Sequence, residues 1–419
     1  MLRHPVSFVA KNALALILSS VGTAALGFVF WAFATRLVRA EFLGRATAEI
    51  AAMSLVANLS QLGFGSTFER FLPIAGSQTR SLVVKGYALS CTVAFVGSLV
   101  YLSLPASRLV LLDSAQRLTF VISTVAWSIF VLQDRVLIAL RKSSLVPVEN
   151  LSFSAAKLVL LPVIVAVSIT QGIYLSWTIP VVAAVAIVSR YVFWTLIPRH
   201  ASQRRNVEAL PSITTIIKLA LGQYVTTILR VFSTSIVALI VIATVGATAS
   251  AYYYIPAMIS SALGQLIYNV VTSFLVESSF DSESIGTHAR SALRVLGVVL
   301  VSGVVIGEIF ASQILRVFGS TYAAHGTTLL RLLLLSLPAL AVTEFYAAFA
   351  WLDRRVWWLA GRELVSLALY LGLVLAFIGR LGIIATGWAA LGSAAAQALF
   401  FAPILVRRYR SETSQLDPS

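Results

Sequence analysis

The chain has 419 residues, of which 59% are hydrophobic and only 11% are charged. A water-soluble protein carries about a quarter charged residues, so this composition excludes a soluble multidomain enzyme and predicts a helical protein embedded in lipid. The net charge of +15 fits cytoplasmic loops beside anionic membrane lipids better than it fits nucleic acid, which is not an expected partner.

Apolar runs long enough to cross a bilayer predict twelve membrane spans. In the first half of the chain they are Asn12–Ala34, Ala46–Phe68, Ser81–Leu104, Leu118–Leu140, Leu151–Thr170 and Tyr174–Ile197. In the second half they are Ile213–Ala243, Ser250–Val276, Ser291–Ala311, Thr328–Trp351, Trp358–Ile378 and Ile383–Val406. The expected fold is an all-α polytopic membrane protein, with about twelve transmembrane helices in two six-helix bundles around a central cavity.

A basic segment separates the two halves of the chain. Residues 1–197 are expected to form an N-terminal six-helix bundle, residues 198–212 a basic cytoplasmic linker, and residues 213–419 a C-terminal six-helix bundle with a short cytoplasmic tail. Placing both termini in the cytoplasm puts most Lys and Arg residues of the connections on the inner side, as the positive-inside rule requires. The predicted location is therefore the plasma or inner membrane.

The two halves repeat each other weakly. Leu59-Ser60-Gln61-Leu62 in the second span is echoed by Leu263-Gly264-Gln265-Leu266 in the eighth. Two halves that each enter the membrane from the cytoplasm would form a parallel repeat, and transporters place their substrate pathway between such halves.

Polar side chains follow one face of several predicted helices. The seventh span places them at spacings of four, three and four residues, which is one helix face. The predicted substrate-binding residues are Gln223, Thr227, Arg230 and Thr234 in the seventh span, Asn58 and Gln61 in the second, and Gln265 and Asn269 in the eighth. With the first span they are expected to line one cleft, although such residues also bond to their own helix or hold helices together.

Charges inside the spans are costly in lipid and usually face a cavity or a partner. Arg230 lies near the middle of its span and is predicted either to bind an anionic head group or to pair with an acid such as Glu344. Glu344 and Glu308 are candidate sites for a coupling ion, with a salt bridge as the alternative for each. Lys157 and the Asp134-Arg135 pair also lie in or near spans, the pair either functional or a snorkelling helix end.

The sequence lacks the motifs of common catalytic sites. It has no P-loop, no HExxH and no GxSxG motif, and its four histidines show no metal-ligand spacing. Its single cysteine, Cys91, lies in an apolar run. The protein is therefore expected not to be an enzyme and to use no cofactor and no metal, so that any transport is driven by an ion gradient or by the substrate's own gradient.

Short motifs spread over most of the chain resemble a known family. They are Glu41-Phe42-Leu43-Gly44, Gln61-Leu62-Gly63-Phe64-Gly65, Glu69-Arg70-Phe71-Leu72, the segment 314–322, Leu329-Leu330-Arg331-Leu332-Leu333 and the segment 380–390. They are similar to polysaccharide (O-antigen type) flippases of the multidrug/oligosaccharidyl-lipid/polysaccharide exporter superfamily. Asp353-Arg354-Arg355 departs from that family, in which many members carry a glycine.

This resemblance implies two six-helix bundles around a cationic cavity. It also implies flipping of a polyprenyl-pyrophosphate-linked oligosaccharide from the cytoplasmic to the outer leaflet, with glycan polymerase and glycosyltransferase machinery as partners. Two alternatives stay open. A small-molecule or multidrug antiporter of the same superfamily should favour buried carboxylates over a central Arg230, and a membrane glycan polymerase or ligase should need a large outer loop. A structural scaffold would leave the polar stripes without a purpose.

Overall fold

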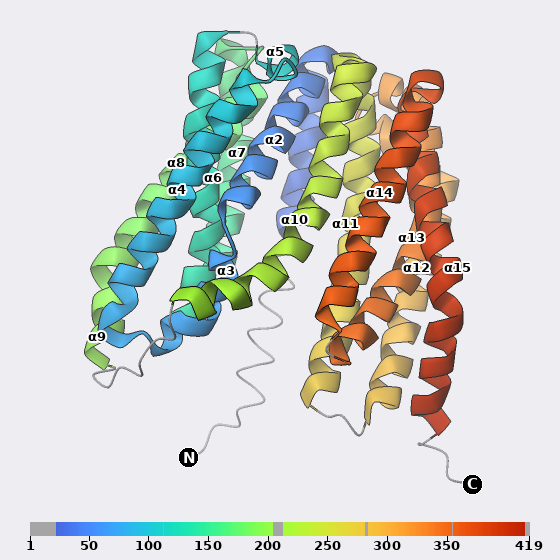
Figure 1. The fold of residues 1–419 in the computed structure, drawn as a ribbon. Coiled ribbons are helices and arrows are strands. Elements are labelled where there is room, and N and C mark those ends of the chain that lie inside the picture. Colours follow the sequence, from blue (N-terminus) through green and yellow to red (C-terminus); the bar gives the residue numbers. More distant parts are fainter. Residues whose placement is uncertain (1–21, 112, 204–212, 281–283, 354, 415–419) are drawn as a thin grey trace. The chain divides into compact units, whose positions relative to one another are not determined.

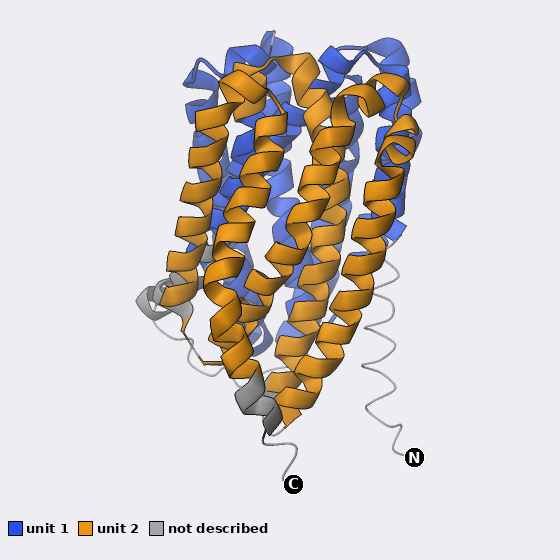
Figure 2. Ribbon diagram, turned by 90° about the vertical axis from the view of Figure 1, so that its right-hand side faces the viewer, with its two compact units in different colours: residues 1–239 blue, residues 240–419 orange. Residues whose placement is uncertain are grey.

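The computed structural model describes residues 22–111, 113–203, 213–280, 284–353 and 355–414. These residues form helices joined by short connections and contain no strand, which confirms the predicted all-α class. The chain divides into two compact units, unit 1 with residues 1–239 and unit 2 with residues 240–419 (Figure 2). The boundary between the units falls inside a helix, and the division predicted at residues 198–212 stays a prediction.

Unit 1 is a bundle of antiparallel helices (Figure 1). It begins with the helix Gly22–Leu37. There follow α2 (Ala40–Ser60), α3 (Phe64–Phe71), two 3₁₀ turns (Leu72–Ile74 and Gly76–Gln78), α4 (Thr79–Ser103), α5 (Ser107–Val110), α6 (Ser114–Ala139), α7 (Leu145–Val167), α8 (Gly172–Tyr191), a π-helical turn (Val192–Leu196), α9 (Ile197–Gln203) and the first part of α10 (Ile213–Thr244).

Unit 2 contains the end of α10 and five long helices. These are α11 (Ala247–Phe280), α12 (Ile285–Arg316), α13 (Ser320–Leu352), α14 (Val356–Leu381) and α15 (Ile384–Ser414). The helix α13 packs against α11, α12 and α15, and 67% of its most apolar window is buried, compared with 11% for α14. It is therefore the central helix of unit 2, whereas α14 exposes most of its apolar surface.

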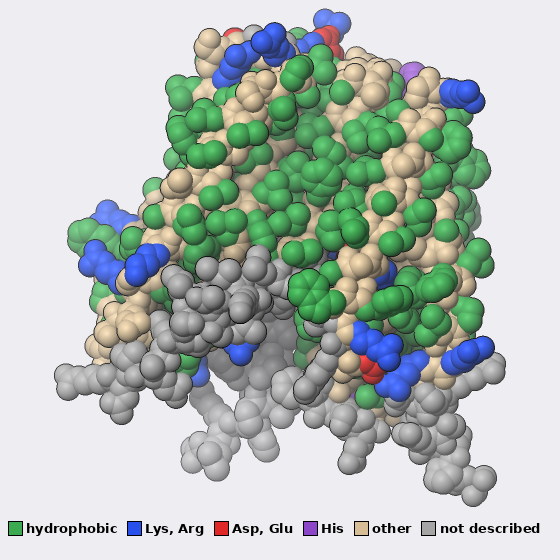
Figure 3. All heavy atoms as spheres, viewed as in Figure 1, with side chains coloured by type: hydrophobic (Ala, Val, Ile, Leu, Met, Phe, Trp, Pro, Cys, Tyr) green, Lys and Arg blue, Asp and Glu red, His purple; other side chains and the backbone are tan. Residues whose placement is uncertain are grey.

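Nine helices among the described residues are long and apolar enough to cross a membrane. The other three predicted spans correspond to the helix Gly22–Leu37, to α2 and to α10. Large apolar side chains are exposed along these helices, such as Val167 at 86% and Val298 at 70%. On the face shown in Figure 3, hydrophobic side chains cover the middle of the helices and the visible Lys and Arg side chains lie toward helix ends. The protein is a multi-pass membrane protein.

The second predicted span, Ala46–Phe68, is wrong as a single helix. The chain forms α2 and α3 with a break between them, where Leu62 and Gly63 have positive φ angles of 49° and 77°. Glycine adopts the left-handed conformation without steric cost, so Gly63 allows the chain to turn at this point. The break places α3 against α6 instead of continuing the line of α2.

The helix α6 organises the interior of unit 1. Its N-terminus is capped by Asp113, whose side chain accepts a hydrogen bond from the backbone N–H of Gln116 at 2.8 Å. The helix packs against α2, α3, α4 and α8. On α4, a methyl group at Gly86 would lie only 2.4 Å from Cζ of Phe68 in α3. A glycine at this position therefore permits close contact between α3 and α4, as small residues do between membrane helices.

Candidate functional site

The polar residues predicted on the second span lie beside α10 in unit 1. Asn58 donates a hydrogen bond to the backbone oxygen of Ser54 at 2.7 Å, and Gln61 donates to Oδ1 of Asn58 at 3.0 Å. From α10, the hydroxyl of Tyr224 donates to the backbone oxygen of Leu59. This contact joins the second span to the seventh, and the meeting of their predicted polar stripes stays a prediction.

Arg230 lies in the apolar part of α10, and its side chain is exposed within the chain. Thr234, one turn further on, donates to the backbone oxygen of Val231 at 3.0 Å, a common arrangement for threonine inside a membrane helix. Gln223 and Thr227 belong to the same helix, and their side chains lie outside the described part of the structure. The exposed guanidinium is costly in lipid and therefore requires water, a partner or a ligand.

The predicted residues of the eighth span form an exposed polar stripe on α11 of unit 2. Gln265 donates to Oδ1 of Asn269 at 3.0 Å, and both side chains are exposed. Exposed amides in an apolar helix are expected to face water or another polar surface. Because α11 belongs to unit 2 and Asn58 to unit 1, the gathering of all these residues in one cleft stays a prediction.

The two glutamates predicted to bind a coupling ion each lie beside an arginine. In unit 2, Nη2 of Arg362 lies 3.4 Å from Oε1 of Glu344 and also contacts Glu363. Arg362 is 8% exposed, so its charge is held inside the protein by these two carboxylates. Glu308 lies 3.7 Å from Nε of Arg331. The salt-bridge alternative therefore describes the observed contacts of both glutamates, and ion coupling at them stays a prediction.

A buried lysine in unit 1 is surrounded by aromatic rings. Lys157 of α7 is 6% exposed, and its Nζ lies 4.1 Å from the ring centre of Trp177, 5.0 Å from that of Phe153 and 5.2 Å from that of Phe30. These rings come from α7, α8 and the first helix. Aromatic faces attract a cation through their negative quadrupole. The sequence indicates a charge inside this span, and helical spacing places Phe153 on the same face four residues earlier, but it gives no sign of the rings of Trp177 and Phe30 on other helices.

Unit 1 also holds two buried carboxylates, Glu49 and Glu149, and a half-buried one, Asp134. Glu49 in α2 is 6% exposed and lies close enough to Tyr101 and Tyr174 to interact with them electrostatically. Asp134 in α6 and Glu149 in α7 lie near each other. Arg135, the residue after Asp134, is exposed and pairs with Glu69 at 2.6 Å. The two members of the Asp134-Arg135 pair therefore have different surroundings.

Sequence reasoning missed Glu49 and Glu149 as functional candidates. Glu149 was placed before the fifth predicted span, which began at Leu151, whereas α7 begins at Leu145 and places Glu149 inside the helix. Pro147 is compatible with this earlier start because proline is tolerated in the first turn of a helix. The described residues hold no group of three or more His, Cys, Asp and Glu side chains that could bind a metal ion.

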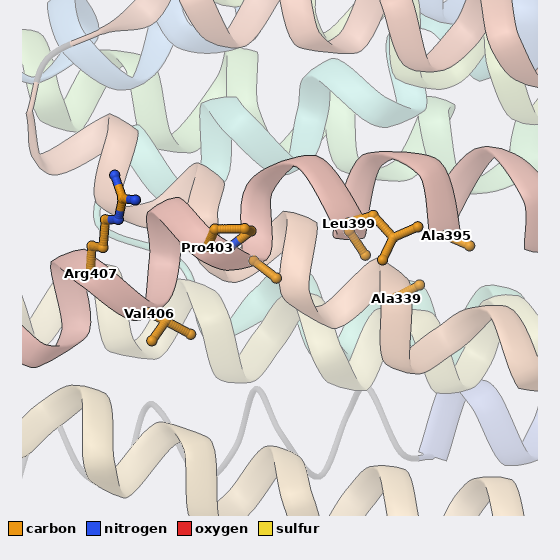
Figure 4. Close-up of a pocket in the computed structure, with 8 residues that line it drawn as sticks. Ala339, Ala395, Leu399, Pro403, Val406 and Arg407 are labelled. Carbon is orange, nitrogen blue, oxygen red and sulfur yellow. The ribbon is translucent and has the colours of Figure 1, made fainter.

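An open groove of about 730 Å³ lies in unit 2 between α13 and α15 (Figure 4). It is lined by Ala339, Ala395, Ala398, Leu399, Ala402, Pro403, Val406 and Arg407. Alanines form half of the lining residues, and Arg407 lies at one end of the row that α15 contributes. The next residue, Arg408, pairs with Asp353 at 3.1 Å, whereas Arg407 forms no ion pair among the described residues. The groove thus combines an apolar wall with a cation at one end.

Sequence comparison gives no relative for this chain, since no known protein family and no curated protein matches it. Its fold, however, is shared with several solved structures of membrane transporters. The lipid II flippase MurJ in an inward closed conformation has a TM-score of 0.65 and 14% identity, covering 97% of this chain and 91% of that one. A variant of the Vibrio cholerae MATE transporter VcmN has a TM-score of 0.62 and 16% identity, covering 97% of both chains.

A third similar structure is an inward-facing multidrug resistance MATE family transporter of the MOP superfamily. It has a TM-score of 0.59 and 12% identity, covering 94% of this chain and 95% of that one. The matches extend over nearly the whole chain, so they concern the complete fold and not one helical hairpin. They confirm a polytopic helical fold with about twelve membrane helices.

Proposed function

We propose that this protein is a membrane transporter that moves a polyprenyl-pyrophosphate-linked oligosaccharide from the cytoplasmic to the outer leaflet for surface polysaccharide assembly. The observation that carries this proposal is the groove of unit 2. Its apolar wall suits a lipid chain, and Arg407 at its end suits an anionic head group. Its volume of about 730 Å³ lies in the range of pockets that hold small molecules, and its open side would let a longer chain continue into the bilayer.

Arg230 supports the same class of substrate. Arg230 places a permanent positive charge in the apolar stretch of α10, where it is exposed and could meet an anionic group. The planar guanidinium can donate two parallel hydrogen bonds to phosphate oxygens, which an ammonium group cannot. The exposed amides Gln265 and Asn269 on α11 are suited to hydrogen bonds with sugar hydroxyls.

The second candidate function is multidrug transport. It is favoured by the fold comparison, since two of the three structures described above are MATE transporters, one of them named for multidrug resistance. A pocket for cationic drugs would use carboxylates that are free to meet the drug. In unit 2, where the groove lies, Glu344 and Glu308 both lie beside arginines, which favours an anionic ligand for that groove.

The test is transport by the purified full-length protein in liposomes. One assay follows a fluorescent polyprenyl-pyrophosphate saccharide through its exposure to a membrane-impermeant quencher, and a parallel assay follows a cationic dye. We expect saccharide flipping, reduced roughly tenfold or more by Arg230→Ala because a charged hydrogen bond is lost. Arg230→Lys should restore only part of the rate, because lysine lacks the planar fork.

Arg380→Ala is the matched control, since Arg380 is an exposed arginine at the end of α14. It should transport the saccharide at the rate of the unmodified protein. Dye transport without saccharide flipping would replace the proposal with the multidrug function. If a well-expressed Arg230→Ala variant flips the saccharide at the full rate, Arg230 does not bind the substrate.

A further inference from the structure

Four buried oxygen atoms without hydrogen-bond partners lie near one another in unit 1. They are the hydroxyl oxygen of Tyr87, Oδ1 of Asp134, and Oε1 and Oε2 of Glu149. Tyr87 is 7% exposed and Glu149 is 6% exposed, so water reaches neither side chain freely. The three residues come from α4, α6 and α7.

The contacts of these side chains show that they lie close to one another. Asn150, the residue after Glu149, donates from Nδ2 to Oδ2 of Asp134 at 3.3 Å and so joins α7 to α6. Asp134 and Glu149 interact electrostatically, and the hydroxyl of Tyr87 interacts with both carboxylates. The Tyr87 hydroxyl is thus a buried polar group that lies near two carboxylates and has no hydrogen-bond partner.

The charges around this cluster leave it with an excess of negative charge. Arg135 is the cation that acts on Asp134 among the described residues, and its guanidinium is held by Glu69 at 2.6 Å. Because Arg135 and Glu69 neutralise each other, the negative charges of Asp134 and Glu149 are not balanced by Arg135. The other ionisable group recorded beside Tyr87 is the thiol of Cys91, which carries no positive charge.

Buried carboxylates without a cation are unstable, because removing a charge from water costs several kcal/mol unless a partner compensates it. Two such carboxylates on neighbouring helices would push the helices apart. A cation between them would remove this repulsion and would also provide the missing partner for each of the four oxygens. Oxygen ligands of this kind suit a small hard cation, and a proton shared by two carboxylates satisfies the same oxygens.

We propose that Tyr87, Asp134 and Glu149 form a binding site for one small monovalent cation, a proton or Na⁺. This site is distinct from Glu344 and Glu308, which lie beside arginines in unit 2. The proposal goes beyond the proposed function, since it concerns ion binding by unit 1 and not the identity of the transported substrate. The proposal holds whether the transported substrate is a drug or a lipid-linked glycan.

The test measures ion binding by the full-length protein in lipid nanodiscs, without any substrate. Radioactive Na⁺ is titrated at constant ionic strength, and infrared difference spectra between acidic and alkaline buffer record the C=O stretch of protonated carboxyl groups. We expect either saturable Na⁺ binding or an infrared carboxyl signal. Whichever signal is present, Glu149→Gln and Asp134→Asn should each abolish it. Tyr87→Phe removes only one oxygen and should weaken binding roughly tenfold.

Glu41→Gln is the matched control, because Glu41 is a 40% exposed carboxylate that pairs with Arg45 on the same helix. It should leave both signals unchanged. Saturable Na⁺ binding would assign the site to Na⁺, and a carboxyl signal without Na⁺ binding would assign it to a proton. The proposal is overturned if neither signal differs between the Glu41→Gln, Asp134→Asn and Glu149→Gln variants. Tyr87→Phe keeps the test valid if a carboxylate variant fails to fold.

Discussion

The aromatic rings around Lys157 provide a quantitative test of how unit 1 tolerates a buried charge. Removing an ammonium from water costs several kcal/mol. Each desolvated cation–π contact offsets roughly 2 kcal/mol, so the rings of Trp177, Phe153 and Phe30 together offset about 6 kcal/mol if each acts fully. These opposing terms are of similar size. We therefore expect Lys157→Met, which keeps an unbranched side chain that is only one atom shorter, to change the free energy of unfolding little or to stabilise the protein.

The contribution of the rings is measured by a double-mutant cycle. Trp177 has the ring closest to the Lys157 ammonium, at 4.1 Å. Trp177→Leu should destabilise the protein by about 2 kcal/mol more when Lys157 is present than in the Lys157→Met background. The matched control is Trp127, which belongs to the same aromatic cluster and stacks on Phe130 at 5.3 Å. No cation contact joins Trp127 to Lys157 among the described residues, so Trp127→Leu should cost the same in both backgrounds.

The assay is reversible unfolding of the full-length protein in mixed micelles, with increasing denaturing detergent and helix content as the signal. Coupling free energies for residues without interaction usually stay within about 0.5 kcal/mol. A coupling between Lys157 and Trp177 below that limit would refute the cation–π account. Equal couplings for Trp177 and Trp127 would also contradict it, since they would indicate a general packing effect.

Two further predictions concern packing and charge. Arg362→Met should destabilise unit 2 by about 3–5 kcal/mol, because it removes a buried cation from between two half-buried glutamates. Glu69→Gln removes only an exposed pair and should cost less than about 1 kcal/mol. Equal losses in the unfolding assay would contradict this prediction. Gly86→Ala should lower the free energy of unfolding by about 1–3 kcal/mol, because the added methyl group would collide with Phe68. At Gly372 a methyl group has open space, so Gly372→Ala should be neutral or stabilising. Similar unfolding midpoints for both variants would disprove the close contact at Gly86.

Most helices could be predicted from the sequence because lipid imposes a simple rule on their length and polarity. Twenty apolar residues between polar connections are needed to cross the hydrocarbon region, and the sequence shows such runs directly. The break at Leu62 and Gly63 was not predicted, because the run Ala46–Phe68 keeps its apolar character across it. The glycine provided a local signal, but glycine is common in membrane helices and does not by itself end one.

The surroundings of the buried charges could not be predicted in the same way. Lys157 was recognised as a charge inside a span, but its rings come from Phe30, Phe153 and Trp177, which lie on three helices. Helical periodicity gives the face of one helix and contains no information on which other helix meets it. For the same reason the arginine beside Glu344, which lies in the next helix, became visible only with the packing of α13 and α14.

The two units hold their buried charges in different ways, and this difference bears on where a cation can bind. In unit 2, Glu344 shares Arg362 with a second glutamate, so a cation binding there would have to displace a guanidinium already in contact. In unit 1, Glu149 has no hydrogen-bond partner for either oxygen, and a cation would displace nothing. Lys157 lies eight residues further along the same helix, about 12 Å away by the rise of an α-helix, which is too far for an ion pair with Glu149. The carboxylates of unit 1 thus offer a cation the larger gain in free energy, which is why we assign ion binding to that unit.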